Sequence, residues 1–109
     1  MSRKRRSDRN HLVYEIECIP TGATYIGITV MKGIAKKRTL QQRWKAHQYK
    51  AFHLGEDWAL PKAIRKHGVD NFDVRVLDVI RGKAAAYAYE AQLINDIKPK
   101  LNTRKKQSK

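Results

Sequence analysis

Apolar and polar residues alternate along two segments near the start of the chain, residues 11–18 and 23–30. This period of two is typical of β-strands that turn one face toward a core. Residues 19–22, Ile-Pro-Thr-Gly, lie between them and have the composition of a turn. The pattern therefore predicts a β-hairpin, with Tyr14 on the first strand and Tyr25 on the second.

Three further segments repeat apolar residues at every third or fourth position, which is the period of a helix. They are residues 39–52, 57–67 and 83–97. Threonine is a residue type that caps helix starts, so Thr39 is predicted to begin the first of them. Residues 72–80 are rich in valine and predict a third strand before the last helix.

The elements therefore follow the order β-β-α-α-β-α. This order predicts an α/β (α+β) fold, in which helices flank a three-stranded, mainly antiparallel sheet. At 109 residues the chain is expected to hold one domain, over residues 11–102. A flexible basic arm (residues 1–10) and a basic tail (residues 103–109) are expected on either side of it.

Positive charge dominates the composition. Lysine and arginine total 24 against 10 acidic residues, which gives a formal net charge of +14. No acid occurs between Glu17 and Glu56, and the loop predicted at residues 31–39 is rich in basic residues. This excess is typical of polyanion binders and favours nucleic acid over a merely solvated surface, without separating DNA from RNA. The residues expected to contact nucleic acid are Lys32, Lys36, Lys37, Arg38 and Lys45.

Several other classes of protein are disfavoured. Cys18 is the only cysteine, so the sequence has no intrachain disulfide and no cysteine-based zinc site. No apolar run approaches the roughly 20 residues of a membrane span, so no membrane partner is expected. The charged first residues are followed by no apolar signal-peptide core, which favours the cytoplasm, or the host cytoplasm if the chain is viral.

Glu90 interrupts the apolar stripe of the last predicted helix. It lies four residues after Ala86 and three before Leu93, on the face that also carries Ile94 and Ile97. A carboxylate on a packed face is unfavourable unless it has a partner. That partner would be either an arginine in an ordinary ion pair, or a metal ion or proton in a cleft.

Arg43 and His47 lie four residues apart in the first predicted helix and flank Trp44, its expected core anchor. Arginine suits the planar, charged oxygens of phosphate, so Arg43 is a candidate phosphate ligand. The alternative is that both residues belong to the solvated face of a basic helix.

Gly27 follows Tyr25 by two residues, on the same face of the second strand. A glycine inside a strand weakens it, and often marks the close approach of a ligand or of another backbone. A tyrosine beside this empty position has room to turn its hydroxyl toward a substrate. Core packing is the alternative for Tyr14 and Tyr25, because aromatic residues are common in strands.

These residues fall into a series of motifs. The series is Leu-Val-Tyr ending at Tyr14, Tyr-Ile-Gly beginning at Tyr25, Gln-Arg-Trp-Lys-Ala-His at 42–47, Arg-Lys-His-Gly at 65–68, Glu90, and Pro-Lys-Leu-Asn at 99–102. In this order and spacing, the chain resembles the GIY-YIG nucleases over about residues 11–102. The motif at 65–68 is similar to phage and homing-endonuclease members, whereas Leu12 replaces the first glycine of the name motif.

The resemblance implies a metal-dependent endonuclease that hydrolyses phosphodiester bonds of DNA, with RNA left open. Glu90 would hold one divalent cation, Mg²⁺ or Mn²⁺, beside the leaving oxygen. Arg43 would neutralise the scissile phosphate. Asn102 would support the site from behind, as would Gly27.

The resemblance also implies that Tyr14 orients or deprotonates the attacking water, assisted by Tyr25 and His47. A free tyrosine has a pKa near 10, so the acting phenol would need the field of Arg43 and the metal to lower its pKa. The sequence does not decide which tyrosine acts.

Two other functions stay open: a non-catalytic, basic nucleic-acid-binding module, and a regulatory protein built on a decayed nuclease fold. The first explains the charge, but not a carboxylate in a helix stripe together with two strand tyrosines. Specificity is expected from the chain's own basic surface, from its tails or from a partner protein. Oligomeric state is not determined by the sequence.

Overall fold

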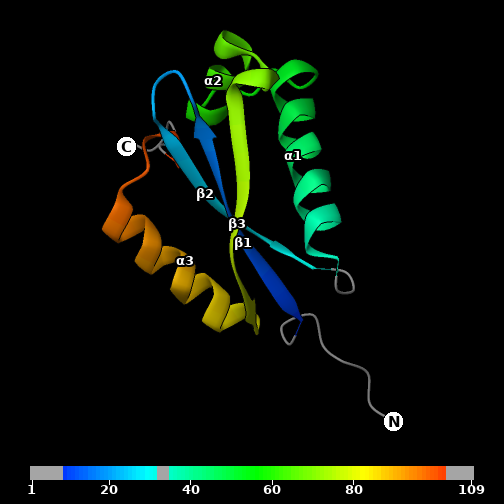
Figure 1. The fold of residues 1–109 in the computed structure, drawn as a ribbon, viewed down its shortest axis with the longest axis vertical. Helices are drawn as coiled ribbons and strands as arrows, with labels where there is room; N and C mark the ends of the chain where they lie inside the picture. The colour runs from blue at the N-terminus through cyan, green and yellow to red at the C-terminus, as the bar shows by residue number, and fades with distance from the viewer. Residues whose placement is uncertain (1–8, 32–34, 103–109) are drawn as a thin grey trace.

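The structure of the chain is a computed structural model that describes residues 9–31 and 35–102. The central strand β1 (Asn10–Cys18) lies between β2 (Thr24–Val30) and β3 (Phe72–Arg81), and both pairings are antiparallel. Helices α1 (Lys36–Phe52) and α2 (Ala59–His67) lie on one side of the sheet and α3 (Lys83–Ile97) on the other (Figure 1). The predicted α+β fold and its element order are therefore confirmed.

The hairpin forms where it was predicted. The backbone N–H of Cys18 donates to the carbonyl of Ala23 at 2.8 Å, and that of Gly22 donates to the carbonyl of Cys18 at 2.7 Å. Gly22 has a φ of 75°, in the left-handed region that glycine adopts without steric cost. This turn fixes the register in which Tyr14 faces Gly27 across the two strands.

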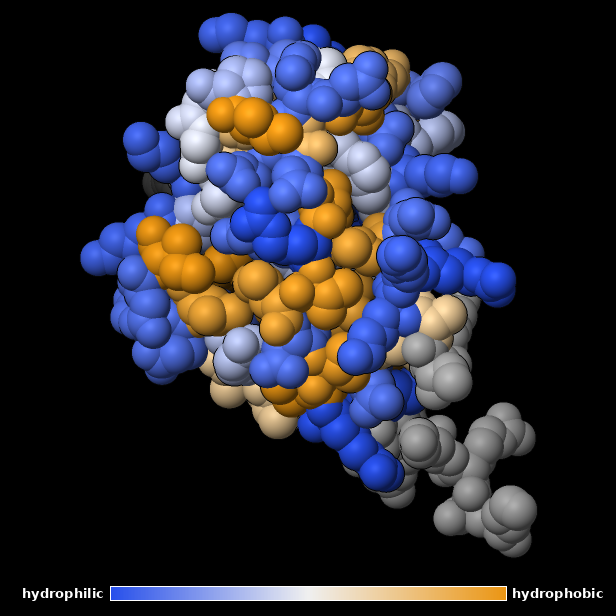
Figure 2. All heavy atoms as spheres, viewed as in Figure 1, coloured by the Kyte–Doolittle hydropathy of each residue, from blue (hydrophilic) through white to orange (hydrophobic). Residues whose placement is uncertain are grey.

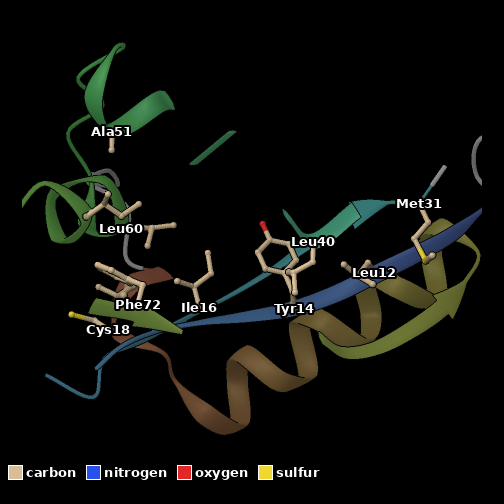
Figure 3. Close-up of a cluster of buried hydrophobic side chains, with 11 residues drawn as sticks. Leu12, Tyr14, Ile16, Cys18, Met31, Leu40, Ala51, Leu60 and Phe72 are labelled. Atoms are coloured by element: carbon tan, nitrogen blue, oxygen red, sulfur yellow. The ribbon is translucent and has the colours of Figure 1, made fainter. Parts of the chain in front are cut away.

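Strand β1 is buried on both of its faces. Leu12, Tyr14 and Ile16 point toward the helices α1 and α2, where they join the main core (Figure 3). Val13 points to the other side, the side of α3, where Ala86 is buried as well. Burying one such aliphatic side chain contributes about 1.5–3 kcal/mol, so the sheet is stabilised from both sides.

A β-bulge in β3 explains why its alternation breaks midway. Tyr14 pairs with Val76 but Val13 pairs with Asp78, so Leu77 is an extra residue. As a result, Val76 and Val79 both pack against the main core although they are three residues apart.

The start of α1 differs from the prediction. The helix begins at Lys36, within the segment predicted to be a loop, and Ala35 occupies the N-cap position. The N–H of Thr39 donates to the carbonyl of Ala35 at 3.0 Å, so Thr39 lies inside the helix and is not its cap. Lysine and arginine are good helix formers, which is why the basic residues before Thr39 extend the helix.

The start of α2 also differs, because the helix begins at Ala59 and not at Asp57. Trp58 is held in an extended conformation, with φ −126° and ψ −179°. Its indole N–H donates to the carboxylate of Glu56 at 3.0 Å, and its ring packs against Tyr25. These contacts keep Trp58 out of the helix. The predicted stop at Gly68 is confirmed.

Helix α3 has the predicted bounds, but its packed face is shorter than predicted. Ala86 is buried, whereas Ile97 is 47% exposed and lines an open cavity beside the β1–β2 turn. The turn residues beside Ile97 are small and leave it partly exposed, so the prediction that Ile97 is packed is wrong. Figure 2 shows apolar residues gathered across the middle of the viewed face, and Tyr87 of α3 is 48% exposed.

The chain after α3 returns to the sheet. Lys98 adopts a left-handed conformation with φ 53° and ends the helix, and Pro99 follows it. The short 3-10 helix η3 (Lys100–Asn102) then buries Leu101 in the main core and brings Asn102 to β2. This is how the Pro-Lys-Leu-Asn motif reaches the strand that carries Tyr25.

Some predictions lie outside the described residues. They concern the arm before Arg9, the tail at residues 103–109, and Lys32. In the two described ranges, no helix combines the length and the apolar character that a membrane span requires.

Candidate active site

Tyr14 is the centre of a polar cluster on the side of the sheet that faces α1. The side chain is 1% exposed, although it carries a hydroxyl. Arg43 donates from Nε to this hydroxyl at 3.1 Å, and His47 Nε2 lies 2.8 Å from it. Residues 43 and 47 are neighbours on one face of α1, so the helix presents both side chains to the same strand position.

The direction of the proton in this cluster follows from His47. Burial, followed by the positive charges of Arg43 and Lys50, lowers the pKa of His47 to about 3. The imidazole is therefore neutral near pH 7, and in the tautomer that carries its proton on Nδ1, its Nε2 accepts a hydrogen bond from the Tyr14 hydroxyl. Arg43 thus donates to Tyr14, and in this tautomer Tyr14 donates to His47.

The pKa of Tyr14 itself is raised. Burial is the largest cause, the neighbouring Tyr25 adds to it, and Arg43 lowers the value by less than these two raise it. Arg43 alone thus does not produce the lowered phenol pKa expected from the sequence. Tyr14 is therefore a neutral phenol in the resting protein, and it has not given its proton to His47.

Gly27 lies directly opposite Tyr14 in the hairpin. A Cβ at this position would be 2.5 Å from the Tyr14 hydroxyl oxygen and 2.7 Å from Cε2 of Tyr25. Glycine is therefore required for the two rings to cross β2 here. The empty position does mark a close approach, but the ring of Tyr14 fills the space that the sequence suggested for a substrate.

Tyr25 is half-buried and belongs to an aromatic group around the Tyr14 hydroxyl. Its ring centroid lies 6.1 Å from that of Tyr14, 5.3 Å from that of His47 and 5.8 Å from that of Trp58. Trp58 was not predicted as a site residue. The only signal in the sequence is a tryptophan directly before a helix start, and nothing local indicates that it reaches a strand 33 residues earlier.

Asn102 holds the strand that carries Tyr25 and Gly27. Its side-chain nitrogen donates to the carbonyl of Ile26, and its side-chain oxygen accepts from the N–H of Ile26, both at 2.8 Å. Because β2 is an edge strand, these backbone groups have no neighbouring strand. The side chain of Asn102 takes the place of a neighbouring strand. It fixes β2 at Ile26, between Tyr25 and Gly27.

Glu90 lies midway along α3, on the opposite side of the sheet from Tyr14. Its carboxylate is half-buried, and burial raises its pKa. Among the residues at 9–31 and 35–102, none forms an ion pair or hydrogen bond with it, so the ordinary ion pair considered from the sequence is absent there. Strand β2, which carries Tyr25, packs against α3, the helix that carries Glu90.

The surroundings of Glu90 limit the kind of metal that would fit. In the described part of the chain, no three His, Cys, Asp or Glu side chains form a cluster that would hold an ion. A zinc site with three or four protein ligands is therefore not supported by those residues. A hard cation that keeps most of its waters needs only one or two carboxylates, and the half-buried Glu90 fits that requirement.

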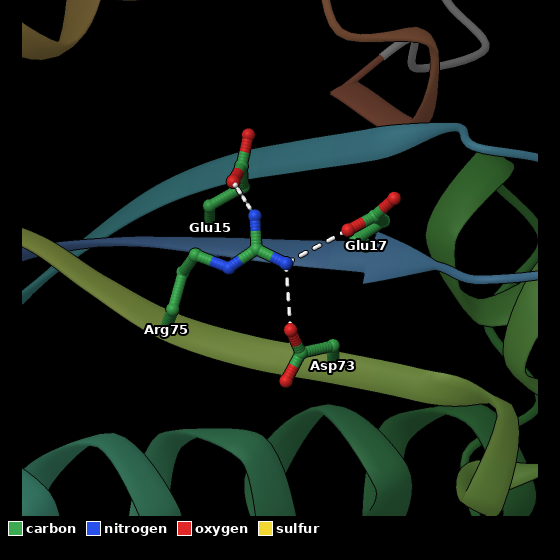
Figure 4. A network of polar contacts seen from close by, with 4 residues as sticks. All are labelled: Glu15, Glu17, Asp73 and Arg75. Atoms are coloured by element: carbon green, nitrogen blue, oxygen red, sulfur yellow. Dashed lines mark hydrogen bonds and ion pairs between the residues drawn. The ribbon is translucent and has the colours of Figure 1, made fainter.

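The remaining predicted contacts to nucleic acid lie on α1. Lys36, Lys37, Arg38 and Lys45 are all exposed. On the other side of the sheet, Arg75 is surrounded by three carboxylates at 2.6–2.8 Å (Figure 4). These carboxylates belong to Glu15, Glu17 and Asp73. The two sides of the sheet thus differ in charge, and the basic side is the one that carries Tyr14.

The burial of neutral His47 is expected to make folding stability depend on pH. An unfolded histidine has a pKa near 6.5, so below that value the unfolded chain takes up a proton that the folded chain does not. Stability is unaffected above about pH 6.5, then falls by up to about 1.4 kcal/mol per pH unit toward pH 3. Urea denaturation at pH 7.5 and pH 5 is expected to show this loss, and H47Q is expected to lose less.

The exposed His53, at the end of the same helix, supplies the control. The variant H53Q should keep the wild-type pH dependence, because no buried imidazole is removed. If the wild type and H47Q lose the same stability between pH 7.5 and pH 5, His47 is not held neutral in the folded protein.

These features define a small α+β domain whose buried tyrosine is joined to an arginine and a histidine. A model of the GIY-YIG catalytic domain matches residues 10–105, nearly the whole chain. The chain therefore belongs to the GIY-YIG nuclease family, whose members act on nucleic acid and generally use divalent metal ions. Neither a curated protein nor a solved structure matches the chain.

Proposed function

We propose that this chain is a metal-dependent endonuclease that hydrolyses phosphodiester bonds in DNA. The observation that carries the proposal is the hydrogen-bonded group Arg43–Tyr14–His47. A buried phenol, an arginine and a neutral imidazole are joined at 2.8–3.1 Å, on the basic side of the sheet. A module that only binds nucleic acid has no need of a proton acceptor held behind a buried phenol.

Arg43 is suited to the scissile phosphate. Its Nε is used by Tyr14, and its two terminal nitrogens make no hydrogen bond with a described residue. One guanidinium group can donate two parallel hydrogen bonds to two oxygens of a phosphate. A positive charge fixed beside the reacting phosphate stabilises the transition state. Arg43 therefore holds the phosphate and the phenol in one arrangement.

Tyr14 and His47 provide a path for the proton of the attacking water. When the water oxygen bonds to phosphorus and the bond to the leaving oxygen breaks, the water loses a proton. Tyr14 accepts this proton on its oxygen and passes its own proton to Nε2 of His47, 2.8 Å away. The low pKa of His47 keeps its Nε2 unprotonated at neutral pH, and the negative charge of a bound phosphate would raise the basicity of this imidazole when the proton arrives.

Glu90 is the proposed ligand of the divalent cation, Mg²⁺ or Mn²⁺. When bound, such a cation stabilises negative charge on the leaving oxygen. Because β2 is an edge strand, groups on the two sides of the sheet can meet one ligand around that edge. Glu90 from the α3 side and Arg43 from the α1 side are proposed to meet the substrate there, with Tyr25 and Gly27 between them.

The basic side of the molecule is the proposed DNA surface. Lys36, Lys37, Arg38 and Lys45 lie along α1, which also carries Arg43. Binding through such contacts releases counterions, so affinity is expected to fall steeply as salt is added.

The proposal is tested by incubating the full chain with supercoiled plasmid and with labelled DNA and RNA oligonucleotides. Nicked or linear plasmid is expected with Mg²⁺ or Mn²⁺, and no product with EDTA. Cleavage of the RNA alone would replace DNA as the substrate. If neither polymer is cut with any divalent ion, while DNA binding persists, the chain is a binding module and the proposal is wrong.

A further inference from the structure

An open cavity lies next to the candidate active site, between the end of β2 and the first half of α1. Its volume is about 410 Å³. Strand β2 contributes Thr29 and Val30, and α1 contributes a stripe of side chains. The side chains of the stripe are Arg38, Thr39, Gln42, Arg43 and Ala46, preceded by Ala35 at the N-cap. We call it the β2–α1 cavity.

The stripe follows the spacing of one helix face. Each member lies three or four residues from another member, so their side chains line up along the cavity. Ala35 and Ala46 stand at its two ends, where small side chains leave room for a ligand. The cavity is therefore built by the helix register and is not an accidental gap between loops.

The donors in the β2–α1 cavity suit an anion. No acid is among the described residues that line it, and neither Arg38 nor Arg43 forms an ion pair with a described residue. The side chains of Thr39 and Gln42 make no hydrogen bond within the described ranges either. Arg38 and two neutral donors thus face one open space without a partner among the described residues, and Arg43 faces it with only its Nε engaged, by Tyr14.

Arg43 connects the β2–α1 cavity to the candidate active site, because it also donates to Tyr14. Arg38 lies five residues earlier, about 7.5 Å along the helix axis. Charges on one DNA strand repeat at about 3.4 Å along the duplex axis, so this offset corresponds to about two nucleotides. A backbone that places one phosphate at Arg43 brings another near Arg38.

We propose that the β2–α1 cavity binds a second backbone phosphate of the nucleic acid, within about two nucleotides of the phosphate held by Arg43. Arg38 supplies the charge, and Thr39 and Gln42 donate neutral hydrogen bonds. The register relative to the cut rests on the proposed function, whereas phosphate binding in the cavity does not. The site fixes where the backbone enters, and so positions the bond that is hydrolysed.

The test is a methylphosphonate walk: in each of a series of DNA duplexes, one phosphate of one strand is replaced by a neutral methylphosphonate, at a different position each time. Binding to each duplex is measured by fluorescence anisotropy without a divalent ion. At one position, the methylphosphonate is expected to weaken binding by the wild-type protein several-fold. The same methylphosphonate should not weaken binding by R38Q any further. The double variant T39V/Q42L should be less sensitive at the same position. The salt slope of R38Q should fall by about 0.9, the value of one phosphate contact.

R81Q is the matched control, since Arg81 is exposed at the end of β3 and does not line the cavity. It removes the same charge but should keep the wild-type response along the walk. If every methylphosphonate that weakens the wild type weakens R38Q and T39V/Q42L equally, the cavity holds no backbone phosphate. Competition by inorganic phosphate that is lost in R38Q, with no response to the walk, would assign the cavity to a free anion and overturn the proposal.

Failure of this inference differs from failure of the proposed function. If the methylphosphonate response depends on Arg38 but the protein cuts no nucleic acid, the second phosphate site stands and the proposed nuclease function is wrong. Cleavage of DNA at the wild-type position by R38Q, with an unchanged walk, would retain the nuclease and remove the second phosphate site.

Discussion

Replacing Glu90 with alanine or glutamine is expected to reduce Mg²⁺-dependent cleavage by at least about 10²-fold, and to leave DNA binding unchanged or stronger. A bound cation contributes several kcal/mol to the stabilisation of a phosphoryl-transfer transition state, and each 1.36 kcal/mol is a factor of ten in rate. The half-buried carboxylate has no partner among the described residues, so its removal should not break another interaction. Cleavage rates and binding constants of the same protein preparation test both parts.

Asp96 provides the matched control, because it is an exposed acid on the same helix. The variant D96N removes the same charge six residues away and should cut at nearly the wild-type rate. Full activity of E90A with Mg²⁺ would show that Glu90 does not hold the cation. Equal losses in E90Q and D96N would assign the effect to the charge of α3 as a whole.

Much of the fold follows from local patterns in the sequence. The hairpin is predicted by two alternating segments and by Gly22, whose positive φ the turn needs. The end of α2 is predicted by Gly68, and α3 by its period. These features depend on residues close together in the chain, so a single sequence suffices to find them.

The helix starts were harder to predict, because they depend on competing interactions. Thr39 has the chemistry of a cap, but the basic residues before it are good helix formers and α1 continues through them. Trp58 is held out of α2 by contacts with Glu56 and Tyr25. The second of these contacts joins residues 33 positions apart, which no local pattern contains.

The candidate site was also predictable only in part from the sequence. Arg43 and His47 were found because four residues on a helix define one face, and that face carries both to Tyr14. The state of the phenol was not predictable, since the pKa of Tyr14 depends on how deeply three elements bury it. Gly27 was interpreted as marking the close approach of a ligand or another backbone, whereas the structure places the ring of Tyr14 against it.

Replacing Tyr14 with phenylalanine is expected to reduce cleavage by about 10²–10⁴-fold, the range that a positioned proton-transfer group contributes. The phenol is the hydrogen-bond partner of Arg43 Nε and of His47 Nε2, so Y14F leaves the half-buried Arg43 and the buried His47 without this partner. Each unsatisfied buried group costs about 1–3 kcal/mol, so stability should fall as well. Single-turnover cleavage and urea denaturation of the same variant separate the two effects.

Two further variants decide whether the loss belongs to this phenol. Tyr49 lies on α1 and is 55% exposed, so Y49F should retain both activity and stability. Y25F removes the neighbouring hydroxyl but leaves the chain from Arg43 to His47 intact, so it should lose less activity than Y14F. A folded Y14F protein that cuts at the wild-type rate would exclude Tyr14 from proton transfer, and a larger loss in Y25F would move that role to Tyr25.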